Sequence, residues 1–268
     1  RDPAAVPEAD LLLVESTYGN RLHKGMAETL EELVFAITDT LGRKGGNLIV
    51  PAFSVGRTQD LLFLLADLTH QGRLPPLTVY VDSPKATAAT QITLRHRELF
   101  DPEAATTLRR FEKLNASPRI SFVEGVAESI ALNDVKGGAV IISASGMCEA
   151  GRIKYHLKYN LGRPECTILI TGFQAAHTLG RRLVDGAKTV KIFGEEIPVR
   201  ADIYTIGGLS AHADQAGLLH WLRQFQKVPG HAFVVHGEPS NTAALAEKIR
   251  QELRWRVTIP GRGASVSF

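Results

Sequence analysis

Two histidines in the last third of the chain lie where an imidazole could do chemistry. His236 follows the apolar run 232–235 and precedes a glycine. A buried strand over that run would hold the imidazole at the rim of a sheet, with a tight turn behind it. His212 lies between Ser210 and Asp214, either of which can accept from the free amides at the start of a helix. The two histidines, 24 residues apart, therefore end two segments that a fold can bring together.

The chemistry that suits His236 is zinc binding. A neutral imidazole nitrogen is a good zinc donor, and a catalytic zinc needs about three protein ligands and an open position. Spacing alone assigns one donor, because the sequence contains neither His-x-His nor His-Glu-x-x-His. A histidine that stands alone at a strand end is otherwise a structural or capping residue. The residues by themselves leave both interpretations open.

Composition indicates a globular protein of 268 residues, long enough for one large domain or two. Its net charge of +3 is compatible with a polyanionic partner and does not by itself indicate one. Cys148 and Cys166 lack Cys-x-x-Cys spacing and are expected to be buried thiols, which favours a reducing compartment. No apolar run reaches the roughly 18 residues of a membrane span. We therefore expect a cytoplasmic location and no membrane partner.

Short apolar runs alternate with helical patterns through most of the chain, which predicts a doubly wound α/β fold. The runs expected to be buried strands are 47–50, 77–81, 139–142 and 167–170. Leucines and other apolar residues at helical spacing cover 30–41 and 61–68, and Ser83-Pro84 is a good helix start. From Ala201 the order becomes strand, loop, helix, strand, loop and helix. These later elements are expected at 203–206, 218–225, 232–235 and 245–253.

Three stretches together resemble motifs A, B and C of the β-CASP branch of the metallo-β-lactamase superfamily. They are Leu12–Gly19, Gly208–Asp214 and Val234–Glu238. Members of that branch are mostly zinc-dependent nucleases, and their β-CASP domain is an α/β insertion in the metallo-β-lactamase αββα domain. The resemblance implies a metallo-β-lactamase segment with motif A at 1–24, a β-CASP doubly wound parallel-sheet domain at 25–200, and a C-terminal metallo-β-lactamase remnant with motifs B and C at 201–268.

The resemblance also implies roles for three side chains. His236 matches the motif C histidine, a metal ligand. His212 matches the motif B histidine, which lies near the scissile phosphate and pairs with the motif A carboxylate, here Glu15. Such a carboxylate fixes the tautomer and favours the protonated imidazole, which can then donate to a leaving oxygen. The plainer alternative is that Glu15 ends a strand and His212 caps a helix.

Further stretches are similar to β-CASP signatures. They are Gly56–Gln59, Ser143–Cys148 with Gly151-Arg152, and Gly172–Ala175 with Thr178–Arg181. Because ligands gather beyond the carboxyl ends of parallel strands, we expect Ser145, Thr178 and Arg181, with Ser210, to contact substrate phosphates. Arg57 either binds an anion or stabilises the fold by pairing with a carboxylate. His177 stands where relatives more often have glycine, and His156 could line the substrate groove, although a structural role is favoured.

The main metal motif of the branch, His-x-His-x-Asp-His, does not occur in this sequence, and neither do the further histidine and bridging aspartate that match it. We therefore expect this chain to be part of a zinc-dependent ribonuclease of the RNA-processing type, inactive alone. Two zinc ions are expected in the full-length protein, and weak or absent zinc here. Single-stranded RNA is the expected substrate, DNA is less favoured, and a homodimer is left open. The alternative is a noncatalytic nucleic-acid-binding β-CASP scaffold.

Overall fold

The computed structural model describes residues 3–102, 104–106 and 118–267. The chain divides into two compact units. The larger unit is Met26–Leu209, and the smaller unit combines Arg1–Gly25 with Ser210–Phe268. The sequence places the change of pattern at about residue 200, whereas the structural division follows Leu209.

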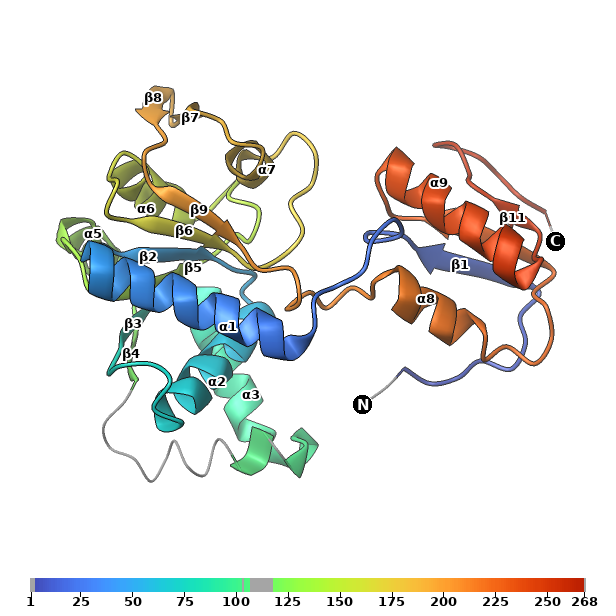
Figure 1. Ribbon diagram of the computed structural model, residues 1–268, viewed down its shortest axis with the longest axis horizontal. Helices are drawn as coiled ribbons and strands as arrows, with labels where there is room; N and C mark the ends of the chain where they lie inside the picture. Colours follow the sequence, from blue (N-terminus) through green and yellow to red (C-terminus); the bar gives the residue numbers. More distant parts are fainter. Residues whose placement is uncertain (1–2, 103, 107–117, 268) are drawn as a thin grey trace. The chain divides into compact units, whose positions relative to one another are not determined.

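A six-stranded parallel sheet forms the centre of the larger unit, in the order β4-β3-β5-β2-β6-β9 (Figure 1). Its strands are β2 (Leu48–Pro51), β3 (Thr78–Val81), β4 (Arg119–Phe122), β5 (Ala139–Ser143), β6 (Thr167–Ile170) and β9 (Asp202–Thr205). The four strands expected from apolar runs are therefore confirmed. β9, which the sequence assigns to the C-terminal segment, pairs with β6 at the edge of this sheet.

Both faces of this sheet are buried, as its near-continuous apolar strands require. Leu48 and Val50 belong to one hydrophobic core, and Ile49 between them belongs to a second. The helices of the unit are α1 (Met26–Ile37), α2 (Arg57–His70), α3 (Pro84–Arg95), α5 (Val126–Ala131), α6 (Ile153–Asn160) and α7 (Leu179–Val184), with the π-helix η1 (Thr38–Lys44) and the 3₁₀ helices η2 (Arg97–Leu99) and η3 (Leu132–Asp134). The expected helix start is confirmed, since Ser83 Oγ accepts from the Ala86 amide and a proline follows.

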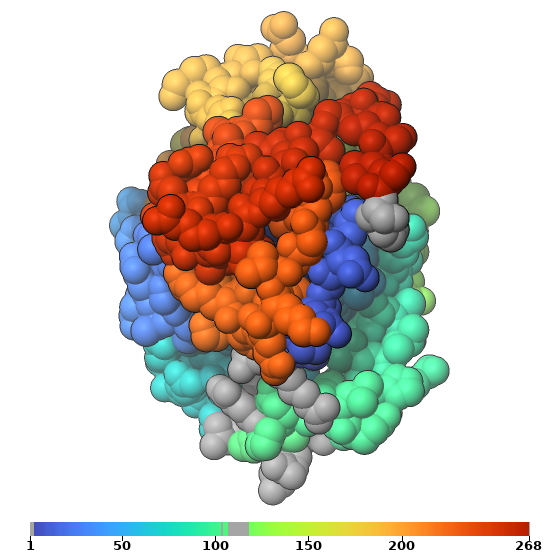
Figure 2. Space-filling view, turned by 90° about the vertical axis from the view of Figure 1, so that its right-hand side faces the viewer, coloured from blue at the N-terminus to red at the C-terminus, as the bar shows by residue number. Residues whose placement is uncertain are grey.

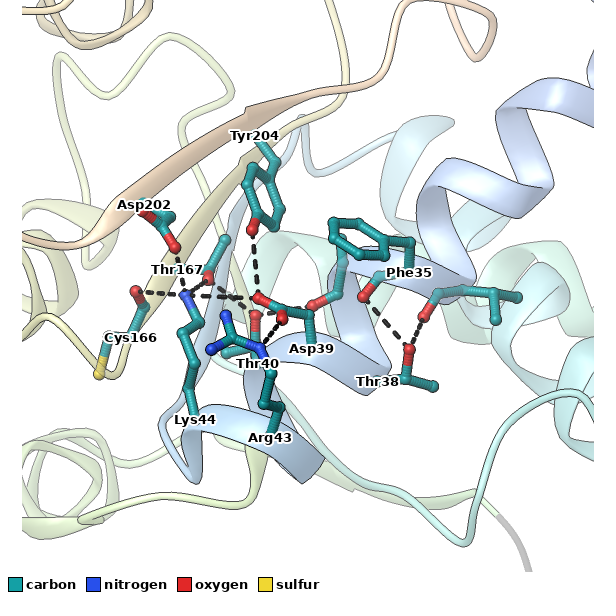
Figure 3. Close-up of polar contacts among 12 residues, drawn as sticks. Phe35, Thr38, Asp39, Thr40, Arg43, Lys44, Cys166, Thr167, Asp202 and Tyr204 are labelled. Carbon is teal, nitrogen blue, oxygen red and sulfur yellow. Dashed lines mark hydrogen bonds and ion pairs between the residues drawn. The ribbon is translucent and has the colours of Figure 1, made fainter.

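A polar cluster fastens η1 to the amino ends of β6 and β9 (Figure 3). The ammonium of Lys44, whose side chain is largely enclosed, lies 2.7 Å from both Thr167 Oγ1 and Asp202 Oδ2. The Tyr204 hydroxyl donates to Asp39 over 3.1 Å. Burial, together with this acceptor, raises the pKa of Tyr204 to about 12, so its proton stays in the bond. The cluster lies at the edge of the sheet opposite the strand carboxyl ends.

A two-stranded antiparallel hairpin lies between α7 and β9 in the chain. It consists of β7 (Thr189–Ile192) and β8 (Glu195–Pro198), joined by Phe193 and Gly194. Cys148 and Cys166 are both buried free thiols, as expected, and burial raises the pKa of Cys148 to about 12. Within the described residues, helices long and apolar enough to cross a membrane are absent.

The smaller unit holds a three-stranded parallel sheet in the order β1-β10-β11. Its elements are β1 (Leu11–Glu15), α8 (Gln215–Leu222), β10 (His231–Val235), α9 (Pro239–Lys248), η4 (Ile249–Leu253) and β11 (Val257–Thr258). β1 pairs with β10 along its whole length, so the first and last parts of the chain lie side by side (Figure 2). Leu12 and Val14 pack with residues of α8 and α9 in a third core.

Candidate active site

The candidate site lies at the carboxyl ends of two neighbouring strands in the smaller unit. Glu15 is the last residue of β1 and stands opposite Val235, the last residue of β10. His236 follows directly. Because side chains alternate along a strand, Glu15 lies on the sheet face away from the core residue Val14. The parallel pairing of the two strands thus places a carboxylate and an imidazole at one edge.

The backbone at His236 is held in an unusual conformation. Its φ is 53°, in the left-handed region that a residue with a side chain adopts rarely. The next residue must be glycine, because a Cβ on Gly237 would lie 2.3 Å from Ser16 Oγ and 2.6 Å from the Ser16 carbonyl. Ser16 Oγ in turn donates to the Val235 carbonyl over 2.8 Å. These contacts define the direction of the His236 side chain.

The loop that carries His212 is fixed from both sides. Asp214 caps α8 by accepting from the Gly217 amide over 2.8 Å, and it also accepts from the His23 amide over 2.9 Å. Burial raises the pKa of Asp214, but these amides outweigh it and hold that pKa below its usual range. The His212 amide donates to Ser210 Oγ over 3.2 Å, so both Ser210 and Asp214 satisfy free amides, as the sequence indicates.

The side chains of the three candidate residues meet. His212 Nδ1 lies 3.2 Å from Glu15 Oε1, which confirms the expected hydrogen-bonding reach. The rings of His212 and His236 stack with centroids 5.6 Å apart and an interplanar angle of 25°. Thr17 Oγ1 lies between them, 3.3 Å from His212 Nδ1 and 3.2 Å from His236 Nδ1. The side chains of His212 and Glu15 are 43% and 28% exposed, so a substrate can reach them.

One assignment of protons satisfies this network. A carboxylate only accepts, so His212 Nδ1 carries a hydrogen toward Glu15. If Thr17 gives its proton to the His236 carbonyl, 3.3 Å away, its oxygen can accept from both Nδ1–H groups. Both imidazoles then keep a lone pair on Nε2. That is the form of histidine that binds a metal or accepts a proton.

The donor set fits zinc. A carboxylate oxygen of Glu15 and a ring nitrogen each of His212 and His236 lie within 4.8 Å of one another. Two nitrogens and one oxygen are ligands that catalytic zinc sites use. Spacing in the sequence identified one donor, His236, and the tertiary structure adds two candidate donors beside it.

The expected substrate residues of the larger unit make local contacts. Ser145 Oγ accepts from the Ala150 amide over 3.3 Å. Thr178 caps α7 by accepting from the Arg181 amide over 3.2 Å. The Arg181 guanidinium pairs with Asp185 at 2.9 Å. Their roles toward a substrate stay predictions.

The two signature stretches that carry these residues lie together. Gln174 Nε2 donates to the Gly146 carbonyl over 2.9 Å. The Gly180 amide donates to the Met147 carbonyl over 3.2 Å. A Cβ at position 180 would lie 1.7 Å from Gln174 Oε1, so a larger residue there would require the Gln174 side chain to shift. The two stretches therefore form one surface of the larger unit.

His177 also belongs to this segment. Its φ is 71°, a value that glycine adopts without strain and that a residue with a side chain adopts rarely. This conformation explains why glycine suits the position.

Two further residues from the sequence analysis make contacts with carboxylates of the larger unit. His156 is buried, with Nε2 2.7 Å from Asp82 Oδ2, and Asp82 also pairs with Arg152 at 2.7 Å. The Arg57 guanidinium lies 3.3 Å from Asp60, and its role toward an anion stays a prediction.

Sequence reasoning missed the residues that support the site. Thr17 bridges the two histidines, and Asn241 Nδ2 donates to the Thr17 carbonyl over 2.7 Å. His23 Nε2 donates to the His212 carbonyl over 2.9 Å, although no spacing linked the two histidines. Thr17 lies inside the motif A stretch, so a hydroxyl two residues after the carboxylate was the one available signal.

Comparisons with known proteins find two domain matches in this chain. The Beta-Casp domain matches residues 58–183, and the Zn-dependent metallo-hydrolase RNA specificity domain matches residues 196–260. Ribonuclease TTHA0252 of Thermus thermophilus is 36% identical over 246 residues, which cover 92% of this chain and 56% of that protein. An RNase J-like protein of Methanocaldococcus jannaschii is 32% identical over 260 residues, covering 96% of this chain and 59% of that protein.

A third relative is the transcription termination factor FttA of Pyrococcus abyssi, 30% identical over 260 residues, with 93% of this chain and 39% of that protein covered. The chain thus spans little more than half the length of the two ribonuclease-type relatives. The two domain matches follow one another in the order that the motifs require. On these matches and on the site geometry, the chain belongs to the β-CASP family of the metallo-β-lactamase superfamily.

Proposed function

We propose that this chain is part of a zinc-dependent ribonuclease that hydrolyses phosphodiester bonds in RNA. The observation that carries the proposal is the meeting of Glu15, His212 and His236 from three separate segments, with donor atoms within 4.8 Å. The names of the relatives, a ribonuclease and an RNase J-like protein, support RNA as the substrate. We assign the smaller unit to the metallo-β-lactamase fold and the larger unit to the inserted β-CASP domain.

The residues of the site would divide the work. His236 would serve as a zinc ligand, and Glu15 and His212 would act beside it as catalytic residues. Zinc, when bound, supplies a Lewis acid that stabilises negative charge on a phosphodiester. Two ions are proposed for the full-length protein. In this chain both Glu15 oxygens already take part in hydrogen bonds, with His212 and with the Thr17 amide, so we expect weak zinc binding.

His212 is proposed to move the proton. Its Nδ1 donates to Glu15, and a protonated ring can give its Nε2–H to the leaving oxygen of the cleaved strand. Thr17 holds this ring near parallel to that of His236. The roles of Ser145, Thr178, Arg181 and Ser210 are proposed as phosphate contacts on a single strand of RNA.

A cytoplasmic location is proposed on the two buried free thiols, which suit a reducing compartment. A homodimer stays a prediction, to be checked by sedimentation. The noncatalytic scaffold is not favoured, because the site brings together groups that bind metal and transfer protons rather than groups that only bind RNA.

The test separates the two histidines in the full-length protein. His236→Ala should lower zinc content and cleavage together, because a ligand is lost. His212→Ala should keep most of the zinc and cleave about a hundredfold to about ten-thousandfold more slowly. Zinc content is measured beside single-turnover cleavage of a single-stranded RNA. Cleavage by His212→Ala at the parental rate would show that this histidine is structural. If the unsubstituted full-length protein binds RNA but does not cleave it, the noncatalytic scaffold is favoured.

A further inference from the structure

A second surface with nucleic-acid chemistry lies in the larger unit and shares no residue with those assigned above. It consists of the outward side of α6 and the tip of the β7–β8 hairpin, which projects beyond α6 in Figure 1. We call it the aromatic–lysine patch, and its residues are Lys154, Tyr155, Lys158, Tyr159 and Phe193.

The three rings of the patch are exposed and partly stacked. Tyr155, Tyr159 and Phe193 are 51%, 48% and 46% exposed. The rings of Tyr155 and Phe193 lie 4.6 Å apart at 36°. Lys154 Nζ lies 5.0 Å from the centre of the Phe193 ring, and Lys158 Nζ lies 6.0 Å from that of Tyr159. Aromatic faces and cations therefore alternate on one surface.

The core of the larger unit does not bury these rings. α6 buries Ile153, His156, Leu157 and Asn160, and this side joins the helix to the core. The lysines and tyrosines occupy the opposite side as two pairs at i and i+4 spacing. Exposed helix positions are usually polar, so two half-exposed tyrosines there call for another explanation.

The tip of the β7–β8 hairpin also holds an exposed aromatic residue that its local structure does not favour. Phe193 has a φ of 52° and Gly194 a φ of 86°, the positive values of a two-residue type I′ turn. Asparagine, aspartate or glycine suits the first of these positions, and a bulky aromatic residue is unfavourable there. The turn therefore holds a phenylalanine that its backbone geometry disfavours and that the core does not bury.

Positive charge lies around the rings. Lys158 pairs with Glu195 at 2.6 Å, which raises the pKa of Lys158 and keeps it charged. Lys191 stands opposite Glu196 in the hairpin. The carboxylates of Glu195 and Glu196 thus each offset the charge of one lysine. Among the five residues of the patch, Lys154 therefore supplies the surplus positive charge, and its ammonium faces the Phe193 ring.

We propose that the aromatic–lysine patch binds single-stranded RNA, with unpaired bases stacked on Tyr155, Phe193 and Tyr159 and a backbone phosphate near Lys154. Exposed rings can stack on bases that are splayed out, whereas bases in a duplex are already stacked. The inference rests on the proposed function and adds a contact surface for the same substrate, outside the residues that would cleave it.

The test measures binding of a fluorescein-labelled oligouridylate to the chain by anisotropy in the presence of EDTA, so that no cleavage occurs. Phe193→Asn and Tyr155→Ala should each weaken binding about fivefold to about a hundredfold. Lys154→Gln should weaken it less and lower the slope of log affinity against log salt by about one. Phe122→Thr and Lys136→Gln, which change an exposed ring and an exposed lysine elsewhere in the larger unit, should bind as the parent does.

Stability is measured in parallel. Phe193→Asn relieves the turn, so its thermal midpoint should not fall, and weaker binding then reports lost stacking. An abasic oligonucleotide should bind the parent and Phe193→Asn equally. Equal binding of the uridylate by the parent, Phe193→Asn and Tyr155→Ala overturns the inference alone. A concentration-dependent dimer that Phe193→Asn abolishes, with RNA binding unchanged, assigns the patch to a second copy and also overturns it. Absence of RNA binding by the parent removes the proposed function as well.

Discussion

The two parallel sheets of this protein differ in how their faces are covered. In the larger unit successive residues of β2, such as Leu48 and Ile49, enter two separate cores on the two faces. In the smaller unit Leu12 and Val14 enter one core, while Leu13 between them is 61% exposed. Parallel sheets are usually covered on both faces. The site residue Glu15 shares the open face with Leu13, so the candidate chemistry lies where the covering is incomplete.

The two units are therefore stabilised by different kinds of interaction. In the larger unit, buried apolar strands stabilise the sheet. In the smaller unit, the site is held by the close approach of Gly237 to Ser16, by the left-handed backbone of His236 and by hydrogen bonds such as that from Ser16 to the Val235 carbonyl. Substitutions in the two units should therefore have unequal effects, and four predictions follow from this difference.

The largest effect is expected for Ile141→Ala in the larger sheet. Ile141 is fully buried, so removing its methyl groups should lower the free energy of unfolding by about 2–5 kcal/mol. Leu13→Ala, at the exposed position of β1, should cost less than about 0.5 kcal/mol in this chain. Urea unfolding followed by circular dichroism measures both. A loss at Leu13 as large as that at Ile141 would show that both sheets are covered alike.

The next effect concerns the buried charge of the larger unit. Burial raises the pKa of Asp82, but hydrogen bonds from His156, Ser129 and Arg152 outweigh it and hold that pKa below its ordinary value of 3.8. A lowered pKa gives stability above the unfolded value that is lost as the pH falls through the folded value. Asp82→Asn should therefore cost about 1.5–3 kcal/mol at pH 7, and the difference from the parent should shrink below about pH 4.

Thermal unfolding of parent and variant from about pH 7 to about pH 3 checks this across the ordinary pKa of an aspartate. Asp185→Asn is the matched control, because its carboxylate pairs with Arg181 at the surface. A difference between Asp82→Asn and the parent that is constant with pH would contradict the electrostatic explanation.

Thr17→Val should have a smaller effect, confined to the site. The variant keeps the shape of the side chain but removes the hydroxyl that contacts both histidines. Loss of such a supporting contact costs about tenfold to about a hundredfold in metal affinity or activity. Zinc titration and RNA cleavage in the full-length protein measure it. Thr17→Ser, which keeps the hydroxyl, should recover most of the loss, and an equal loss in both variants would point to packing instead.

The smallest effect is a gain. His177 is exposed and has a φ of 71°, so His177→Gly should raise the free energy of unfolding by about 1 kcal/mol. The thermal midpoint measures this gain. Gly172→Ala, in the same segment, has open space for a methyl group and a φ outside the left-handed region, so it should change the midpoint little. A fall in stability for His177→Gly would mean that the imidazole makes a contact worth more than the strain.

Much of the fold followed from local sequence. Apolar runs predicted β2, β3, β5 and β6, and Ser83-Pro84 predicted the start of α3. β4 was missed because its residues are partly exposed rather than a continuous apolar run. The β7–β8 hairpin was missed because its turn, Phe193-Gly194, lacks the asparagine or aspartate that usually marks such turns.

The amino-acid sequence alone indicates which functional groups are present: a carboxylate at Glu15, imidazoles at His212 and His236, and strands and loops to hold them. The pairing of β1 with β10, and the contacts of Thr17 with both histidines, become visible in the folded chain. Parallel neighbours are joined through long connections, and periodicity reports which face of a strand is buried but not which strand lies next to it. The site therefore depends on the pairing of β1, near the start of the chain, with β10, near its end, and local sequence patterns do not predict that pairing.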